Sequence, residues 1–306
     1  MPTCARKEPP LDFRSLETFV WIARLGSFRA AAPRVYTSQP SVSSRIANLE
    51  HELGVKLFDR TGRQVSLTAK GRDLLDYAER LLALRGEMLQ SVADPGAIGG
   101  TIRLGVAETI VYTWLPRLIE RLSEAYPAVT LELDVDISVH LADKLANHDI
   151  DLAFLMGPVN QPDITNLPLC RYPLCWVASP QLPLPDEPVS LAALAAWPII
   201  TYPRLSKPHA AIRSMLERGG HRARIHSSSS LATIIRMTVD GIGVSALPAE
   251  ILGRELSQGQ LQRFAVTAPQ LDLEFTVSYG ITPESPVARA IADLAVASAR
   301  ETFPGQ

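Results

Sequence analysis

The segment that most constrains how this chain can fold is residues 38–53, which has the pattern of an amphipathic helix with a polar first turn. Thr37 or Ser38 can accept a backbone N–H as N-cap, and Pro40 falls in the first turn, whose N–H groups need no helical partner. The apolar side chains recur at helical spacing: Val42, Ile46, Leu49 and Leu53. We therefore predict a helix that begins near residue 39 and buries this stripe.

The neighbouring segments complete a small domain. Upstream, a second apolar stripe stops at Gly26, which suits the left-handed end of a helix, and Ser27 can cap another helix that carries three alanines. The upstream stripe consists of Leu16, Phe19, Val20 and Ala23. Downstream, residues 57–67 predict two short strands around a glycine-containing turn. This order of helices and hairpin is typical of a winged helix-turn-helix, which reads DNA.

The polar residues of this domain have the chemistry that DNA recognition requires. Short hydroxyls and an amide at a helix N-terminus fit the major groove, and Gln39 offers the donor and acceptor pair that suits an adenine edge. We assign Gln39 and Ser43 to base contacts. Arg60 and Arg63 flank the predicted turn, where phosphates or a minor groove can be reached. Taken alone, the helix is also compatible with a well-capped surface helix, but the flanking elements favour DNA.

Three motifs in this domain resemble the N-terminal signature of LysR-type transcriptional regulators. They read G-S-F-x-x-A-A-x-x-V-x-x-S-Q-P-S-V-S, then L-E-x-E-L-G-V-K-L-F-D-R, then L-T-x-x-G. The resemblance implies that Gln39, Pro40 and Ser43 face bases, and that Ser27, Arg34 and the wing arginine contact the DNA backbone. The predicted DNA-binding residues are Ser27, Arg34, Ser38, Gln39, Pro40, Ser43, Ser44, Arg45, Arg60 and Arg63.

Two positions depart from the family pattern. Pro33 lies within the first helix of the motif, where it removes one hydrogen bond at a cost of about 3 kcal/mol and should shorten or bend the helix. Many relatives place arginine directly after the V-S pair, whereas this chain has Ser44 there and Arg45 next. We therefore expect a sequence preference that differs from the family norm.

Charge is distributed unevenly along the chain. The net charge of −2 combines 11 Lys/Arg and 6 Asp/Glu in residues 1–70 with 19 Lys/Arg and 26 Asp/Glu in the rest. The basic excess thus lies where phosphates would be met. The first ten residues are polar and contain proline, and the longest apolar runs, such as residues 191–200, are shorter than a membrane span. We expect a cytoplasmic protein with no membrane partner.

A predicted linker helix follows the wing, from about residue 69 to residue 91. Its apolar side comprises Leu74, Leu75, Ala78, Leu81, Leu82 and Leu89, and residues 94–100 then break the helix. Such a seam can be buried against another copy of the chain. The resemblance implies a homodimer through this helix, commonly a homotetramer, with double-stranded operator DNA and RNA polymerase as further partners.

From residue 101 the pattern alternates strands and helices, which predicts an α/β fold. Strands are expected at 102–106, 129–136, 151–155, 174–178, 198–201, 223–226, 243–246 and 273–279. Helices are expected at 110–125, 141–147, 209–218 and 231–239, and from 287 onward. Two lobes with a cleft between them, resembling periplasmic binding proteins, are the expected architecture. The D-G-I-G-V-S-A-L-P run at 240–248 extends the LysR resemblance into this part.

The expected domains follow from these elements. They are a disordered tail (1–10), the winged helix-turn-helix (11–68), the linker helix and hinge (69–98) and an effector-binding domain (99–306). Lobe I of the last domain spans about 101–169 and 272–306, and lobe II spans about 170–271. The fold class is α/β overall.

Ligand-binding residues are expected where strands end and helices begin, since the N–H groups there favour anions. The resemblance implies an inducer pocket lined by positions matching Thr109, Ser138, Pro208 and His209, which commonly holds a small carboxylate or aromatic acid. The full predicted set is Glu108, Thr109, Ser138, Tyr202, Lys207, Pro208, His209 and Ser230. Charges in 202–210 are equally compatible with solvated loops. If Glu108 points inward it disfavours a carboxylate and selects a cationic or hydroxyl group; otherwise it caps its helix.

Two alternatives remain at this point. Cys170 and Cys175 are close in sequence and suggest a redox-responsive regulator, although buried thiols on strands are commoner. A two-lobed α/β domain can also be an enzyme. However, Ser245 lacks the second glycine of a nucleophile elbow, and the chain has neither a phosphate-binding loop nor metal-ligand spacing. We therefore expect no catalytic residues, no metal and no cofactor.

Overall fold

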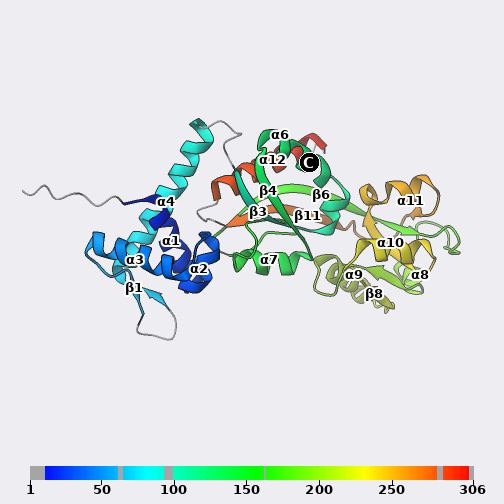
Figure 1. Ribbon diagram of the computed structural model, residues 1–306. Helices are drawn as coiled ribbons and strands as arrows, with labels where there is room; N and C mark the ends of the chain where they lie inside the picture. Colours follow the sequence, from blue (N-terminus) through cyan, green and yellow to red (C-terminus); the bar gives the residue numbers. More distant parts are fainter. Residues whose placement is uncertain (1–10, 61–64, 93–98, 162, 281–284, 303–306) are drawn as a thin grey trace, which may run out of the picture. The chain divides into compact units, whose positions relative to one another are not determined.

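The computed structural model describes residues 11–60, 65–92, 99–161, 163–280 and 285–302 (Figure 1). The chain divides into two compact units, the first made of residues 1–94 with 281–287 and the second of residues 95–280 with 288–306. The tail at 1–10, whose disorder was expected from the sequence, and the predicted DNA contact Arg63 lie outside the described residues.

The N-terminal unit is a helical domain with a small hairpin. Its elements are α1 (Phe13–Leu25), α2 (Phe28–Arg34), α3 (Gln39–Leu53), β1 (Phe58–Asp59), β2 (Ser66–Leu67) and α4 (Ala69–Val92). The side chain of Ser38 accepts the N–H of Ser41 and caps α3, as predicted. Gly26 ends α1 with φ 60°, a left-handed conformation that glycine adopts without steric cost. β1 and β2 pair antiparallel at the base of the expected wing.

The apolar stripes of the first three helices form one core. Phe19, Val42 and Ile46 have no exposed surface, and Phe58 from the hairpin joins them. Leu53 was predicted to continue the stripe of α3 but is 40% exposed. It is the last residue of the helix, and the following Val55 packs against the core instead.

Pro33 lies in the last turn of α2. The helix has seven residues and ends at Arg34, one position after the proline. Proline lacks an N–H and its ring crowds the preceding turn, so it removes one helical hydrogen bond here. That Pro33 shortens the helix stays a prediction.

Helix α4 packs against α1 through one face. Ala78 and Leu82 are buried there, and the ion pairs Arg24–Glu79 (2.7 Å) and Arg85–Glu17 (2.6 Å) join the two helices. Another side of α4 exposes large apolar side chains at helical spacing: Tyr77, Leu81, Leu84, Met88 and Val92. Leu89 was also predicted to lie on the apolar side of this helix, but its side chain is not among those that the structure describes.

The C-terminal unit is built on a mixed sheet with helices on both faces (Figure 1). The strands run in the order β4-β3-β5-β11-β6-β9-β7-β8, and β10 also pairs with β6. Their bounds are β3 (Gly99–Val106), β4 (Ala128–Val135), β5 (Leu152–Leu155), β6 (Ile164–Ala178), β7 (Ile199–Thr201), β8 (Ile225–Ser227), β9 (Val244–Pro248), β10 (Gln262–Phe264) and β11 (Asp272–Gly280).

The helices of this unit connect the strands. They are α5 (Glu108–Tyr112), α6 (Leu115–Ala125), α7 (Ser138–Ala146), α8 (Leu191–Ala195), α9 (Lys207–Arg218), α10 (Leu231–Val239), the short 3-10 helix η2 (Ala249–Leu252), α11 (Gly253–Ser257) and α12 (Ser285–Thr302). Alternate residues of β5 contact opposite sides: Phe154 packs on Trp114, whereas Ala153 and Leu155 pack with Leu141 of α7. Side chains alternate across a strand, so α7 and the segment that carries Trp114 cover opposite faces.

Strand β6 joins the two lobes. Residues 164–173 pair with β11, whereas 174–178 pair with β9 and β10. The predicted strand at 174–178 was therefore much too short. Pro168 and Pro173 argue against a continuous strand in sequence, but β6 accommodates Pro168 at a shift in register opposite Phe275 and Thr276.

The predicted single helix at 110–125 is two helices. α5 ends at Tyr112 and α6 begins at Leu115, because Pro116 cannot donate to the carbonyl four residues earlier and would clash with it. The break turns Trp114 into the interior, where it is 1% exposed. The other predicted helices and strands are present within a few residues, except that α7 begins three residues earlier, at Ser138.

Candidate functional site

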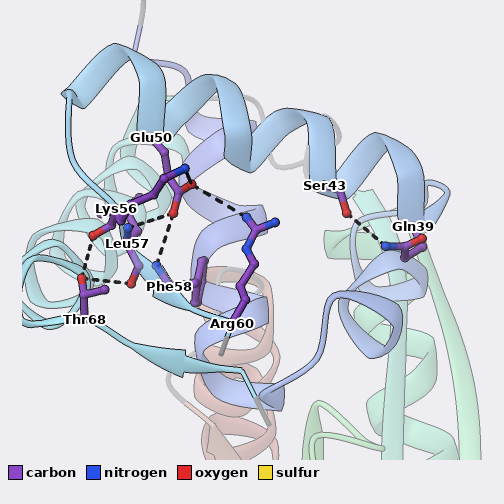
Figure 2. A network of polar contacts seen from close by, with 8 residues as sticks. All are labelled: Gln39, Ser43, Glu50, Lys56, Leu57, Phe58, Arg60 and Thr68. Carbon is purple, nitrogen blue, oxygen red and sulfur yellow. Dashed lines mark hydrogen bonds and ion pairs between the residues drawn. The ribbon is translucent and has the colours of Figure 1, made fainter. Parts of the chain in front are cut away.

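The first turn of α3 presents a polar surface. Ser38, Gln39, Pro40 and Ser44 are exposed, and Ser43 is half-buried. The Nε2 of Gln39 donates a hydrogen bond to the Oγ of Ser43 at 3.0 Å (Figure 2). The two residues assigned to base contacts therefore support each other along one ridge of the helix. A side-chain amide held in this way loses less rotamer freedom when it meets a base.

Three other predicted DNA contacts are bound within the domain itself. The hydroxyl of Ser27 accepts the N–H of Ala30 and caps α2. The guanidinium of Arg34 lies 5.4 Å from the ring centre of Trp21, and Nη1 of Arg45 donates to Thr18 at 2.8 Å. These arginines are oriented by α1, a constraint that spacing along the sequence did not indicate.

Glu50 anchors the hairpin to the end of α3 (Figure 2). Its buried carboxylate accepts the N–H groups of Leu57 (2.9 Å) and Phe58 (3.3 Å) and the ammonium of Lys56 (2.9 Å). Burial alone would raise the pKa of Glu50, but these hydrogen bonds outweigh it and hold the pKa below its usual value. Glu50 lies within the L-E-x-E-L-G motif, yet sequence reasoning gave it no role.

Arg60 is held at the base of the wing. Its guanidinium lies 4.5 Å from the ring centre of Phe28 and 3.8 Å from the carboxylate of Glu50. The side chain is nevertheless 47% exposed, so it can still meet a phosphate. The Oγ1 of Thr68 donates to the carbonyl of Lys56, which ties the start of α4 to the same network (Figure 2).

The C-terminal unit contains a cavity of about 450 Å³ between the two lobes. Six predicted residues line it: Glu108, Thr109, Ser138, Tyr202, Lys207 and Ser230. Between them the wall is mainly apolar and includes Val135, Leu155, Val159, Leu231, Ile234 and Phe275. The N-terminal residues of α7, α9 and α10 border the cavity, as expected where strands lead into helices.

The predictions for Pro208 and His209 need correction. Neither residue lines the cavity. Both are buried with Ile212, Met215 and Leu216 on the face of α9 that packs into its lobe. The turn that starts α9 directs Ser206 and Lys207 toward the cavity and the next two residues away from it. Burial lowers the pKa of His209, and the nearby charges of Arg213 and Arg204 lower it further.

Tyr202 brings an unsatisfied polar group to the cavity wall. Its side chain is only 6% exposed, and its hydroxyl has no hydrogen-bond partner within hydrogen-bonding geometry among the described residues. Burial raises the pKa of Tyr202, while the neighbouring Thr109 lowers it and the charge of Glu108 raises it. A buried hydroxyl without a partner is costly.

Two charged residues of the cavity reach across from one lobe to the other. Oε2 of Glu108 in lobe I accepts the N–H of Leu231, the first residue of α10 in lobe II, at 2.6 Å. The ammonium of Lys207 in lobe II donates to the carbonyl of Gly157 in lobe I. Glu108 therefore caps a helix, but the helix belongs to the other lobe rather than its own.

The remaining polar groups of the wall are more fully paired. Asp136 accepts hydrogen bonds from Lys144 and His140, each at 2.9 Å. Burial would raise the pKa of Asp136, but these partners keep it low. The Oγ of Ser138 accepts the N–H of Met156 at 2.9 Å. Ser138 thus helps to hold the end of β5 beside α7.

The two described cysteines lie far apart along β6. They are five residues apart on one strand, which corresponds to about 16 Å, whereas the Cα atoms of a disulfide lie within about 7 Å. Burial raises the pKa of Cys170 to about 11 and also raises that of Cys175. The separation of Cys170 from Cys175 and their raised pKa values both weigh against a redox relay between these two cysteines.

Searches for other kinds of site gave clear results within the described parts of the chain. No group of three or more His, Cys, Asp or Glu residues there could hold a metal ion. None of the helices in those ranges has the length and apolar character needed to cross a membrane.

These features define a class of protein in which a winged helix-turn-helix is combined with a two-lobed domain around a small-molecule cavity. Comparisons with known proteins agree. The family model of the LysR substrate binding domain matches residues 95–300, and that of the bacterial regulatory helix-turn-helix protein, lysR family, matches residues 13–72. The chain therefore belongs to the LysR family of DNA-binding transcriptional regulators, whose C-terminal domain binds an effector.

Individual relatives cover nearly the whole chain. The HTH-type transcriptional regulator YeiE of Escherichia coli K12, described as uncharacterized, is 30% identical over 85% of this chain and 88% of its own. The solved structure of ArgP from Mycobacterium tuberculosis has a TM-score of 0.63 at 23% identity, and covers 94% of this chain and 97% of its own. Full-length LysG from Corynebacterium glutamicum with bound effector Arg has a TM-score of 0.59 at 20% identity, with 95% and 99% covered. The two structures show a common fold.

Proposed function

We propose that this regulator changes its DNA binding and transcriptional output in response to a small carboxylate or aromatic acid. It acts in the cytoplasm, on double-stranded operator DNA, and has no catalytic activity of its own. Ligand binding alters how the two lobes close, and this change reaches the DNA through the geometry of the oligomer and then affects recruitment of RNA polymerase.

The observation that carries the proposal is the chemistry of the cavity. Its wall is largely apolar, as a hydrocarbon or aromatic body requires, and its volume suits a small metabolite. Lys207 is the first residue of α9, so an ammonium and a helix N-terminus coincide at one place in the wall. Together they favour a negatively charged group.

The contact of Lys207 with Gly157 gives a route from binding to conformational change. The ammonium of Lys207 donates to a neutral carbonyl of the other lobe. A carboxylate is a stronger partner for an ammonium than a carbonyl is. An acid in the cavity would therefore draw Lys207 from Gly157 and alter one of the contacts between the lobes.

The exposed face of α4 supports assembly into a dimer. Tyr77, Leu84 and Met88 are each more than half exposed and, with Leu81 and Val92, form an apolar stripe along the helix. An apolar stripe of this length on a helix is stabilised when a second copy covers it. We propose a homodimer through α4 that pairs into a homotetramer, which places two DNA-reading helices on successive half-sites.

A binding screen on the full chain tests the effector class. Thermal unfolding is followed with small aliphatic acids, aromatic acids, amines and neutral metabolites, because a ligand of the native state raises Tm by mass action. We expect a saturable shift with an acid, which Lys207→Met diminishes. Lys70→Met, in the N-terminal unit, is the matched control and should leave the shift intact. Stabilisation by amines alone would contradict the acid class.

A further inference from the structure

The N-terminus of α10 is already occupied by a carboxylate of the protein. Glu108 stands at the start of α5, and its Oε2 accepts the N–H of Leu231 at 2.6 Å. The hydroxyl of Ser230 accepts the N–H of Thr233 in the same turn. Because helix N-termini attract anions, this end of the cavity would otherwise be a place for the acid group of a ligand. In this protein the carboxylate of Glu108 already occupies that place.

This occupancy restricts where a ligand acid can bind. A second carboxylate beside Glu108 would meet a like charge and would find the N–H of Leu231 already engaged. Asp136 and Asp143 also line the cavity and add negative charge to its wall. Among the described residues that line the cavity, Lys207 alone is a lysine or arginine, and we place the acid group there.

One hydrogen-bonding position of Glu108 is open. Oε1 of Glu108 accepts no hydrogen bond from the residues that the structure describes, and Glu108 lines the cavity. A ligand hydroxyl in the cavity can donate to Oε1, whereas a methyl group cannot.

We propose that Glu108 is a specificity-determining residue, which admits an acid that carries a hydroxyl and excludes a diacid. The ligand is a small hydroxy acid: its carboxylate binds the ammonium of Lys207, its apolar body lies against Val135, Leu155 and Phe275, and its hydroxyl donates to Glu108. This assignment rests on the proposed function of the cavity as an acid-binding site.

Matched sets of three acids test the assignment by calorimetry on the full chain. Each set shares one carboxylate and differs at the far group, which is methyl, hydroxymethyl or carboxylate. The aromatic set is para-toluate, para-hydroxymethylbenzoate and terephthalate, and the aliphatic set is pentanoate, omega-hydroxypentanoate and glutarate. In at least one set, we expect the wild type to bind the hydroxy acid about tenfold more tightly than the methyl acid and to reject the diacid.

Variants at Glu108 supply the control. In Glu108→Ala the N–H of Leu231 becomes free, so the diacid should become the preferred ligand. In Glu108→Gln the amide oxygen can still cap α10. The affinity for the diacid should therefore rise less than in Glu108→Ala. Equal binding of hydroxy acid and diacid by the wild type, or an unchanged ranking in Glu108→Ala, would overturn the assignment.

A second measurement does not depend on the effector. Glu108→Ala should have a lower Tm than the wild type, and sodium acetate should restore it more than sodium chloride at equal ionic strength, because acetate can replace the missing carboxylate at α10. Acetate should give no such extra gain with the wild type or Glu108→Gln. If no acid of either set binds the wild type, the proposed effector class fails. The effect of acetate on the Tm of Glu108→Ala then tests the position of Glu108 at α10 independently. Absence of the acetate effect would refute its place at α10.

Discussion

Replacement of Glu50 tests whether a buried carboxylate holds the wing against the DNA-reading helix. In Glu50→Ala the N–H groups of Leu57 and Phe58 lose their acceptor, and both residues are buried. Each unpaired buried donor costs about 1 to 3 kcal/mol, so we expect the N-terminal unit to lose about 3 kcal/mol of unfolding free energy. The ion pair with Lys56 adds little, because the Lys56 side chain is 78% exposed.

Glu50→Gln is the matched control. Its amide oxygen can still accept one or both N–H groups, so only the charge is lost, and we expect a loss of about 1 kcal/mol. Hydrogen exchange of peptides that cover residues 50–60 reports opening at this site in the full chain, and urea unfolding gives the free energy. The reasoning is refuted if Glu50→Ala and Glu50→Gln have equal stability, or if exchange at Leu57 and Phe58 is unchanged in both.

The same carboxylate predicts a dependence on acid. The pKa of Glu50 is lower in the folded protein than in the unfolded chain, so its contribution is fully present above the unfolded value near 4.5. This contribution declines as the pH falls through the folded pKa, because the protonated group is a weaker acceptor for the N–H groups of Leu57 and Phe58 and no longer attracts Lys56. Between pH of about 5 and about 3, the wild type should therefore lose more stability than Glu50→Gln.

Three further predictions concern DNA, assembly and pH. Gln39→Ala should reduce the preference for specific over random DNA by about 1 to 3 kcal/mol. Arg63→Ala should weaken binding to all DNA sequences alike and should lower the slope of log affinity against log salt concentration. If a binding titration shows that Gln39→Ala loses equal affinity for specific and random DNA, the role of Gln39 is refuted. Leu84→Asp should raise the dimer dissociation constant about 100-fold in analytical ultracentrifugation, because a carboxylate would be buried in an apolar seam, and an unchanged constant would place the interface elsewhere. The pKa of His209 is lower in the folded protein than in the unfolded chain, so the unfolded chain binds the proton first as the pH falls below about 6.5. Below that pH, thermal unfolding should show that His209→Gln loses less stability than the wild type. Parallel losses in the two proteins would contradict this.

Local signals in the sequence predicted much of the fold. The cap at Ser38 and the left-handed Gly26 depend on neighbouring residues alone, and both are present as expected. Pro33 lies one residue before the end of the seven-residue α2. The break between α5 and α6 was missed although Pro116 signals it, since proline favours the first turn of a new helix and disrupts the interior of a longer one.

Features that depend on tertiary packing were not predictable in this way. The long β6 contains two prolines, and its pairing with β11 is visible only once distant segments meet. The cap on Leu231 comes from Glu108, more than a hundred positions away in the chain. Likewise, neighbouring residues of one turn diverge: Lys207 reaches the cavity, whereas His209 is buried in the lobe. Sequence spacing identifies the turn but not the direction of each side chain.

The central claim, that ligand binding in the cavity controls DNA binding, is tested most directly by the DNA complex of the full chain. An operator fragment is footprinted, and its bend angle measured, with and without a saturating acid identified by the binding screen. The account predicts that the acid shifts the footprint or the bend, and that Lys207→Met requires more acid for the same change. A saturated protein whose footprint and bend both stay the same would contradict it.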